Sequence, residues 1–466
     1  MNSENKIRQS LILLSLVIIS LYAISFFKPE FEIAGLSIMP VDIFLDIKSD
    51  ENSESINDNS FNRQLNRPSI TFAEFGFSNT IAAMMNFISG ENNSNLPPFQ
   101  GVKTQLFGNT KQLSYFFDAL KNSKTKTVRI AHYGDSAIEG DLITSNIRDD
   151  LQKRFGGNGV GWLSIISQDI TFRMTTKHTF SDNWESAAVY TNNPKSLPFG
   201  ISGEVAVPKG NSWVQYETTR ARRSLKDFSV VKLYYSNAKN SQINFSFDGG
   251  AKQSAPLKTG SGIQELILKP QSKAKSIRIE FPLADQAYFY GVTLENETGL
   301  YIDNLPLRGN SGVDIGQISP STFKDFAKYL DYKLILLEFG LNISGKAGTD
   351  YSWYEREMQK VINQIKQAFP KTSIVMISVH DRSTRKGNNF ITDPTIFKLL
   401  ETQKNIARQA DVALWSMFDA MGGENSMPKW VNANPPLASK DYIHFNDQGA
   451  AKIAQLFVES LMSEYK

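Results

Sequence analysis

In the C-terminal third of the chain, short apolar runs alternate with longer segments whose apolar residues recur at helical spacing. Leu334–Leu337 is apolar throughout and Ile374–Val379 almost so, whereas residues 351–369, ended by Pro370, have apolar residues three and four positions apart. Apolar strands separated by helices are typical of a parallel sheet covered on both faces. The predicted strands are 127–131, 334–337, 374–379 and 412–418, and the predicted helices are 142–156, 314–330, 351–369, 394–409 and 447–463.

Residues 160–300 have a different pattern, in which apolar and polar residues alternate over short stretches. Ile243, Phe245 and Phe247 fall on one face of a predicted strand, and Asp248-Gly249 supplies a turn after it. Short alternating strands separated by Gly, Pro and Asn turns favour an antiparallel β-sandwich. Because this segment lies between the first strand–helix unit and the later ones, we expect a domain inserted into the α/β domain.

Composition narrows the classes of function. The chain has 466 residues, 50 of them basic and 47 acidic, so a formal net charge of +3 gives no indication of a nucleic-acid partner. This length is typical of two or three domains. Cysteine is absent from the sequence, which excludes disulfides, thiolate metal ligands and a cysteine nucleophile. The histidines and carboxylates form no metal-binding motif, so we expect neither a metal nor a cofactor.

Four short motifs lie at positions that a parallel sheet would bring together in space. Gly134-Asp135-Ser136 and Gly340-Leu341-Asn342 each follow a predicted strand. Asp441-Tyr442-Ile443-His444 precedes the last helix, and Asn310-Ser311-Gly312 precedes the helix predicted at 314–330. Ligands of such sheets bind at the carboxyl ends of the strands, so we expect the motifs to converge there.

Together these motifs contain the groups of a serine hydrolase. Serine is a weak nucleophile until a base accepts its proton, and His444 is the candidate base for Ser136. Asp441 can bind the other imidazole nitrogen and stabilise the imidazolium. Attack on an ester creates an oxyanion, which requires donors already in place. Suitable donors are the backbone N–H of Ser136, the backbone N–H of Gly312 and the side-chain amide of Asn342.

The motifs resemble the four blocks of the SGNH (GDSL-type) hydrolase superfamily, which supply Ser, Gly, Asn and His in this order. The resemblance covers residues 125–156 and 305–466 and implies a doubly wound α/β fold with a parallel sheet. It implies that the catalytic residues are Ser136, Asp441 and His444, and that the oxyanion hole is formed by Ser136, Gly312 and Asn342.

The inserted domain makes the resemblance more specific. A β-sandwich between the Ser and Gly blocks is similar to the bacterial peptidoglycan O-acetylesterase branch, where it resembles a carbohydrate-binding module. Residues 129–136 (RIAHYGDS) and 301–304 (YIDN) are also similar to that branch. The implied substrate is an O-acetylated glycan of the cell envelope, such as peptidoglycan. Two residues depart from the superfamily pattern: Ala137 replaces the common Leu, and Ile343 stands where many members have Asp.

The N-terminal region indicates where the protein acts. Residues 11–27 are uncharged and mostly apolar, and at 1.5 Å per residue they reach about 25 Å, the short end of a membrane span. Lys6 and Arg8 precede this segment, which predicts a cytoplasmic N-terminus and an exported remainder. A signal peptide cleaved near Ala23-Ile24-Ser25 is the alternative. We expect a single-pass protein of the inner (cytoplasmic) membrane, with its catalytic domain facing the periplasm or extracytoplasmic space.

These patterns divide the chain into four parts. They are a cytoplasmic tip and membrane anchor (1–28), a juxtamembrane region with a polar linker (29–111), an SGNH hydrolase domain (112–159 and 301–466) and the inserted β-sandwich (160–300).

Three functions fit these residues. The first is a serine esterase that removes O-acetyl groups from an envelope polysaccharide. The second is an O-acyltransferase that uses the same triad to acetylate an envelope glycan, with a membrane-bound acyltransferase as a further partner. The third is a catalytically inert glycan-binding protein. The sequence does not separate the first two, since both form the same acyl-enzyme.

Other conspicuous residues have simpler interpretations. We expect His132 to pack or hydrogen-bond structurally, His380 to be a loop contact or a substrate-side group, and His178 to lie on the surface. Asp135 is expected to shape the turn at Ser136. The aromatic residues Trp162, Trp184 and Trp213 are suited to stacking on sugars, although core packing is the commoner role. The basic cluster Arg220, Arg222 and Arg223 is expected to be a solvated loop.

Overall fold

The structure, a computed structural model, describes residues 31–33, 36–38, 101–284, 286–345 and 348–465. The chain forms two compact units, residues 1–92 and 93–466. In the first, β1 (Phe31–Ile33) pairs antiparallel with β2 (Leu36–Ile38). The predicted anchor at 11–27 lies outside the described residues. Among the helices that the structure describes, none has the length and apolar character required to span a membrane.

A mostly parallel sheet forms the centre of the second unit. Its order is β16-β4-β17-β18-β21, with β3 antiparallel at the edge beside β21. When the five parallel strands are numbered by their order in the chain, their order across the sheet is 2-1-3-4-5. The direction of winding therefore reverses between β4 and β17, where a crevice forms outside the strand ends. The bounds are β3 (Phe107–Gly108), β4 (Thr127–Gly134), β16 (Gly299–Pro306), β17 (Tyr332–Glu338), β18 (Ser373–Ile377) and β21 (Ala413–Trp415).

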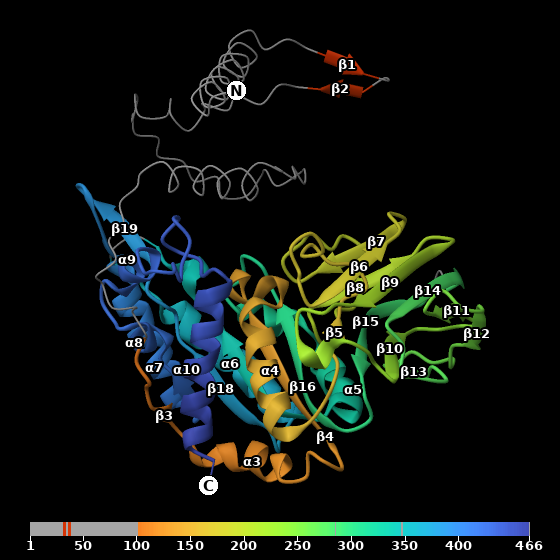
Figure 1. Ribbon diagram of the computed structural model, residues 1–466, viewed down its shortest axis with the longest axis horizontal. Helices are drawn as coiled ribbons and strands as arrows, with labels where there is room; N and C mark the ends of the chain where they lie inside the picture. Colours follow the sequence, from red (N-terminus) through yellow and green to blue (C-terminus); the bar gives the residue numbers. More distant parts are fainter. Residues whose placement is uncertain (1–30, 34–35, 39–100, 285, 346–347, 466) are drawn as a thin grey trace, which may run out of the picture. The chain divides into compact units, whose positions relative to one another are not determined.

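Helices cover both faces of this sheet, as Figure 1 shows. Along β4, Val128 and Ile130 pack in the cluster that contains α4 and α10, whereas Ala131 and Tyr133 pack in the cluster that contains α5, α6 and α7. This alternation follows from the two-residue period of a strand and buries both faces. The helices are α3 (Ser114–Leu120), α4 (Leu142–Phe155), α5 (Pro320–Leu330), α6 (Ser352–Ala368), α7 (Thr395–Gln409), α8 (Met417–Met421), α9 (Ser426–Val431) and α10 (Asp447–Ser463).

Between α4 and β16 the chain forms two antiparallel sheets that pack face to face. Leu233 and Val292 of one sheet share a buried cluster with Val214 and Ile279 of the other. The predicted combination of a parallel sheet with separate antiparallel sheets is therefore confirmed. The first sheet contains β5 (Gly161–Leu163), β7 (Trp184–Ala188), β8 (Glu204–Pro208), β10 (Val230–Ser236), β13 (Gln264–Leu268) and β15 (Tyr288–Glu295), and the second contains β6 (Thr176–Phe180), β9 (Ser212–Thr218), β11 (Gln242–Phe247), β12 (Gln253–Pro256) and β14 (Ser276–Leu283).

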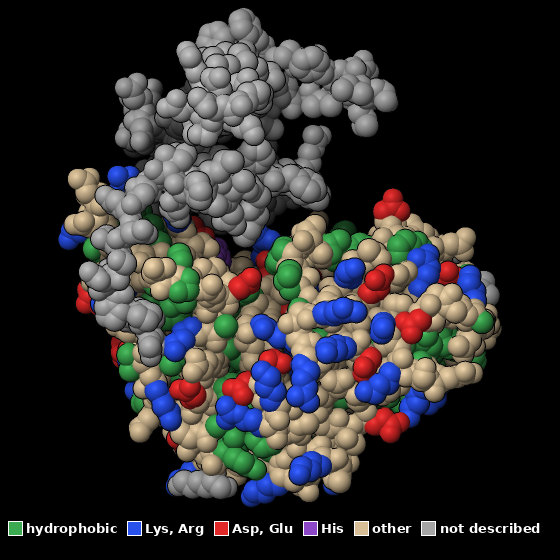
Figure 2. All heavy atoms as spheres, in the orientation of Figure 1, with side chains coloured by type: hydrophobic (Ala, Val, Ile, Leu, Met, Phe, Trp, Pro, Cys, Tyr) green, Lys and Arg blue, Asp and Glu red, His purple; other side chains and the backbone are tan. Residues whose placement is uncertain are grey.

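The sandwich and the α/β part share one hydrophobic core. The ring of Trp162 stacks on Tyr234 at 5.4 Å and contacts the Phe326 ring of α5 edge-on at 6.0 Å. Trp162 is 1% exposed, so it is a core residue and not a sugar-stacking surface. Buried ion pairs join Arg129 of β4 to Glu295 of β15 and to Asp303 of β16. On the face shown in Figure 2, basic and acidic side chains are interspersed over both parts.

Several elements differ from the sequence predictions. The strand predicted at 412–418 is only β21, because the Ser416 side chain accepts the Asp419 N–H and starts α8. The helix predicted at 314–330 is interrupted, since Ser319 and Pro320 begin α5 after a short 3-10 helix, η5 (Val313–Gln317). An antiparallel hairpin of β19 (Ser383–Lys386) and β20 (Asn389–Thr392) was not predicted.

His178 is buried and not on the surface, which corrects the prediction. Its ring stacks on Tyr216 at 4.5 Å, and its Nε2 lies 3.1 Å from the carbonyl oxygen of Ile165. Burial lowers the pKa of His178 to about 4, so the ring is neutral in the sandwich core. Buried and exposed residues alternate along β6, and His178 falls on the buried face.

Candidate active site

The predicted site residues lie at the carboxyl edge of the central sheet. Ser136 begins the 3-10 helix η3 (Ser136–Asp141), one residue after β4 ends. Asn342 lies in η6 (Leu341–Ile343), just beyond β17. Because β4 and β17 are the neighbouring strands at which winding reverses, these two residues stand on either side of the crevice.

Asp135 shapes the turn that presents Ser136. Its Oδ1 accepts the backbone N–H of Ala137 at 3.0 Å, and its own N–H donates to the carbonyl oxygen of Glu338 on β17. The carboxyl is buried, and burial raises the pKa of Asp135 to about 7. The role expected for Asp135 from the sequence is the one it has here, and Ser136 stays partly exposed.

The structure brings Ser136, His444 and Asp441 together, although 308 positions separate the first two. Ser136 Oγ lies 3.4 Å from His444 Nε2, and His444 Nδ1 lies 2.8 Å from Asp441 Oδ2. The hydrogen bond to Asp441 raises the pKa of His444 above its ordinary value. This contact places the Nδ1 proton against the carboxylate and leaves the Nε2 lone pair facing Ser136.

Backbone groups orient the carboxylate of Asp441. Its Oδ1 accepts the N–H of Ile443 at 2.9 Å and that of His444 at 3.0 Å. Burial alone would raise the pKa of Asp441. The hydrogen bonds from His444 and from the backbone nevertheless hold this pKa below its ordinary value. The aspartate is therefore ionised at neutral pH and fixed in direction.

Residues outside the predicted motifs support the turn that carries His444. Nε2 of His380 lies 2.8 Å from the carbonyl oxygen of Ile443, and burial lowers the pKa of His380 to about 4, so the neutral ring donates this bond. Tyr442 has a left-handed backbone with φ 59°. Its ring is stacked on Phe390 of the β19–β20 hairpin, at 3.7 Å and 10°. His380 is thus the loop contact expected from the sequence, while the hairpin was missed because its polar composition gave no signal.

The loop at Gly312 lies beside the same edge. Gly312 has φ +93°, and a Cβ there would approach the Phe339 ring to 2.8 Å, so only glycine fits. Its N–H donates to Asn310 Oδ1 at 2.6 Å. The Asn342 amide donates to Asp135 Oδ2 and to the carbonyl oxygen of Asn310, each at 3.0 Å. Asn342 therefore ties the three loops together, and the Gly312 and Asn342 donors have protein partners.

A buried polar network lies beneath the nucleophile. His132 Nε2 contacts Glu338 Oε2 at 2.9 Å, and Thr144 Oγ1 contacts His132 Nδ1 at 3.0 Å. The Asn304 amide donates to Thr144 Oγ1 at 2.8 Å and to the carbonyl oxygen of Ile138 in η3 at 2.9 Å. These contacts join β4, β16, β17 and α4, so His132 has the structural role expected for it.

The remaining predicted aromatic and basic residues lie away from these contacts. Trp184 meets Phe281 edge-on within the sandwich at 5.1 Å, and the Arg278 guanidinium lies 3.9 Å from the ring of Trp213. In the basic cluster, Arg220 and Arg223 are exposed, whereas Arg222 donates to Asn146 of α4. The ring face of Trp213 is thus already covered by a cation on one side.

Comparison with known proteins bears on the fold. No protein-family model and no curated protein matches the chain. A solved structure of a peptidoglycan O-acetylesterase is similar with a TM-score of 0.64 and 22% identity, over 77% of this chain and 98% of that chain. This chain has the fold of that esterase. The resemblance expected from the sequence is thereby confirmed at the level of the fold.

Two further solved structures are similar only weakly. A family two carbohydrate esterase from Cellvibrio japonicus has a TM-score of 0.26 and 10% identity, over 62% of this chain and 98% of that chain. A salicylyl-acyltransferase from a tetracycline biosynthetic pathway has a TM-score of 0.27 and 14% identity, over 65% of this chain and 97% of that chain. These TM-scores are too low to assign a shared fold.

Proposed function

We propose that the protein is a serine esterase that removes O-acetyl groups from a cell-envelope glycan such as peptidoglycan. The observation that carries this proposal is the contact chain from Ser136 through His444 to Asp441 at the crevice of the sheet. The fold shared with a peptidoglycan O-acetylesterase supports the choice of an acetyl ester and of a glycan.

In the first half of the reaction, Ser136 Oγ attacks the acetyl carbonyl carbon while its proton passes to His444 Nε2. Asp441 stabilises the imidazolium that forms. The tetrahedral intermediate then collapses, and the bond to the sugar oxygen breaks. That oxygen takes the Nε2 proton and leaves as a hydroxyl, which leaves an acetyl group on Ser136. The resting Oγ–Nε2 distance of 3.4 Å shortens by a small side-chain rotation, as is common once substrate is bound.

In the second half, water replaces the sugar. His444 takes one proton from the water as it attacks the acetyl-serine. When the tetrahedral intermediate collapses, this proton passes to Ser136 Oγ, and acetic acid leaves with the second proton of the water. Both halves therefore require His444 to be neutral at the moment of attack.

The oxyanion is held by three donors in this scheme. The backbone N–H of Ser136 has no hydrogen-bond partner among the described residues. For the oxyanion, the Gly312 N–H gives up the side-chain oxygen of Asn310, and the Asn342 amide gives up the carbonyl oxygen of Asn310. A negatively charged oxygen is a stronger acceptor than a neutral carbonyl, which favours this exchange only when charge develops.

The test is hydrolysis of 4-methylumbelliferyl acetate and of O-acetylated peptidoglycan by the purified protein. Ser136→Ala is expected to lower both rates by roughly 10³-fold or more, because only donors and binding contacts remain. Ser321→Ala, at an exposed serine in α5, is the matched control and leaves both rates unchanged. Unchanged turnover by Ser136→Ala would contradict the mechanism. Transfer of acetyl to added glycan in place of acetate release would favour the O-acyltransferase.

We further infer that the described domain works outside the cytoplasmic membrane, held by the segment at 11–27. The apolar run and the basic residues before it support this location. Because the natural chain contains no cysteine, a single introduced cysteine reports topology. In intact spheroplasts, a membrane-impermeant maleimide should label Lys252→Cys, which is an exposed site just before β12. It should not label Lys6→Cys. Labelling of both or of neither overturns this location.

A further inference from the structure

Exposed apolar side chains gather in the loop between β5 and β6. Among the described residues, ten large hydrophobic side chains are exposed, and three of them, Ile170, Phe172 and Met174, lie within five consecutive positions of this loop. Their exposed fractions are 37%, 46% and 67%. Single apolar residues on a surface are common, whereas a cluster of them indicates a surface that meets an apolar partner.

Asp169 fixes the shape and the attachment of this loop. Its carboxylate accepts the Gly140 N–H of η3 at 3.1 Å and pairs with Arg173 at 3.2 Å. Its carbonyl oxygen accepts the backbone N–H groups of Phe172 and Arg173, at 3.2 Å and 2.9 Å. The exposure of the apolar side chains is therefore a property of an ordered turn. Because η3 begins with Ser136, the turn is attached beside the active-site edge.

A basic loop adjoins the apolar one. β6 begins directly after the apolar loop, and its partner β9 ends directly before residues 219–223. The Thr219 hydroxyl donates to the carbonyl oxygen of Met174 at 2.8 Å, which joins the two loops. The basic cluster follows in the sequence as Arg220, Arg222 and Arg223. In the part of the chain that the structure describes, no carboxylate forms an ion pair with these three arginines.

Apolar side chains beside positive charges without carboxylate partners suit the surface of an anionic bilayer. The boundary between headgroups and acyl chains accepts apolar side chains, and the negative surface potential attracts arginine. An acidic glycan would pair with the arginines, but it offers no apolar phase for Ile170 and Met174. A lipid surface satisfies both loops at once.

We propose that the apolar loop at 170–174 and the basic loop at 219–223 together bind the surface of an anionic membrane. The apolar side chains enter the headgroup boundary, and the arginines contact lipid phosphates. Since Asp169 holds the apolar loop on η3, the active-site edge lies beside the bound lipid. This surface belongs to the described domain and is separate from the anchor proposed at 11–27. The inference does not depend on the proposed chemistry, because no catalytic residue takes part in the binding.

The experiment measures contact with lipid at position 174 in the full chain, reconstituted with lipid vesicles. Because the natural chain has no cysteine, Met174→Cys carries a single NBD fluorophore. Lipids with a doxyl group near the headgroup end of the acyl chain should quench this label about twofold or more in vesicles that contain phosphatidylglycerol, and little in vesicles of phosphatidylcholine alone. Added salt should reduce the quenching, because it screens the attraction between the arginines and the lipid.

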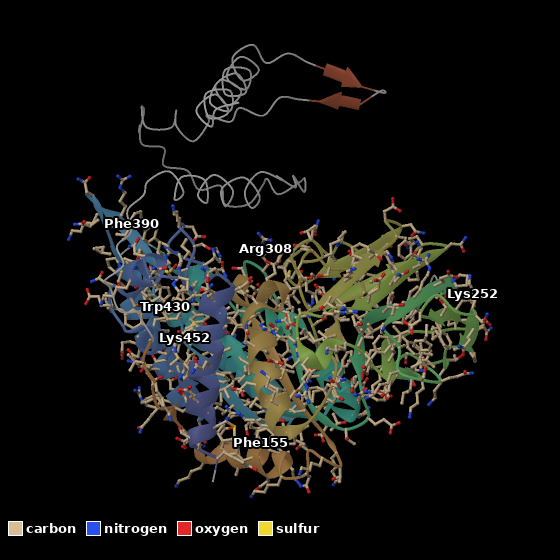
Figure 3. The ribbon with its side chains drawn as sticks, viewed as in Figure 1. Phe155, Lys252, Arg308, Phe390, Trp430 and Lys452 are labelled. Atoms are coloured by element: carbon tan, nitrogen blue, oxygen red, sulfur yellow. The ribbon has the colours of Figure 1, made fainter. Side chains whose placement is uncertain are left out.

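A second label position controls for the anchor and for random collisions. Lys252→Cys carries the same fluorophore, and Figure 3 shows Lys252 at the outer end of the sandwich. This label should not be quenched in either kind of vesicle.

Charge-reversal variants, labelled at position 174, test the basic loop. Arg220→Glu combined with Arg223→Glu should abolish the quenching. Lys239→Glu combined with Lys258→Glu makes the same change of net charge at two exposed lysines and should leave the quenching unchanged. These lysines are suitable controls because Lys239 lies beyond the opposite end of β10 from the arginines, and the bridge between Ala238 and Gly260 holds the segment of Lys258 beside it.

An isoleucine pair tests the apolar loop in the same way. Ile170→Asp should abolish the quenching, whereas Ile267→Asp, at a 49% exposed isoleucine of β13, should not. Circular dichroism verifies that each variant folds, and the charge-reversal variants decide if Ile170→Asp does not fold.

Three results would overturn the proposal. They are an unquenched label at position 174, equal quenching with and without phosphatidylglycerol, and a loss of quenching in the control variants as large as in the loop variants. The first result would assign the two loops to a protein partner with an acidic and apolar surface instead of a membrane.

Discussion

Asp441→Asn is the substitution that tests the geometry of the active site most directly. In the native chain one carboxylate oxygen receives the Nδ1 proton of His444, and the other accepts two backbone N–H groups, from Ile443 and His444. Asparagine has a single acceptor oxygen. It can serve the imidazole or the backbone, but not both, so His444 loses either its tautomer or its orientation.

Two contributions set the magnitude. Unit charges about 4 Å apart attract by about 1 kcal/mol in water and about 4 kcal/mol near a protein surface. The two side chains are 43% and 45% exposed, which places the loss of this attraction at about 1–2 kcal/mol. The lost hydrogen bond to a charged group adds about 1.5–3 kcal/mol. A total of about 2.5–5 kcal/mol corresponds to a roughly 10²- to 10⁴-fold lower kcat/KM on the alkaline plateau.

The pH profile supplies a second, independent signal. The base must be neutral, so kcat/KM rises with pH as His444 loses its proton. The hydrogen bond to Asp441 holds the pKa of His444 above its ordinary value, so the acid limb of the native profile lies at higher pH than the titration of a free imidazole. Removing the carboxylate lowers this pKa. In Asp441→Asn the acid limb therefore moves to lower pH, even though the plateau falls.

The assay is initial-rate hydrolysis of 4-methylumbelliferyl acetate from pH 4.5 to pH 9 with the natural protein and with Asp441→Asn. Asp447→Asn removes the same charge three positions after His444, at an exposed site in the first turn of α10, and controls for the long-range field. The plateau and acid limb of this control should match those of the natural protein. The assignment of His444 as the base held by Asp441 would be refuted if Asp441→Asn lowered the rate without shifting the acid limb. A shift of the acid limb in both Asp441→Asn and Asp447→Asn would refute it as well.

Three further substitutions test other contacts. Gly312→Ala places a Cβ on a residue with left-handed backbone and should lower the free energy of unfolding by about 1–3 kcal/mol, as measured by urea denaturation. Rate assays should show a lower kcat as well. Phe390→Ala removes the ring stacked on Tyr442 and should lower kcat roughly 2- to 10-fold, because such aromatic pairs contribute about 0.5–1.5 kcal/mol. The control is Phe397→Ala, which should leave kcat unchanged; Phe397 is 40% exposed and Phe390 is 39% exposed. Arg129→Met leaves the buried carboxylate of Asp303 without a cation and leaves Glu295 with Lys232 alone, and should cost about 3–5 kcal/mol in urea denaturation. A loss below about 1 kcal/mol would contradict the buried ion pairs.

The sequence predicted the α/β elements well where burial alone decides structure. The apolar run at Leu334–Leu337 is the centre of β17, and the helix predicted at 447–463 coincides with α10. The convergence of Ser136, Asn342 and His444 was also predictable, because parallel strands place their carboxyl ends at one edge. Their catalytic roles stay predictions until the variants are measured.

Sequence patterns predicted less where distant partners satisfy buried polar groups. β16 is a buried strand, yet it contains Asp303 and Asn304, which a hydrophobic pattern does not assign to a core. Asp303 is tolerated because Arg129, 174 positions away, pairs with it, and because the Tyr332 hydroxyl donates to it. Such pairing depends on tertiary structure, so no local pattern shows it. The hairpin whose Phe390 supports Tyr442 was missed for a different reason, because its strands are mostly polar.

The hydrophobic cluster shared by the sandwich and the α/β part has a consequence for how the protein unfolds. A module on a flexible linker melts by itself, whereas this sandwich is fixed against α5 by the ring of Trp162 and against β4 by Arg129. The two parts are therefore expected to lose structure in one transition. Urea denaturation followed by tryptophan fluorescence and by helix content should give the same midpoint.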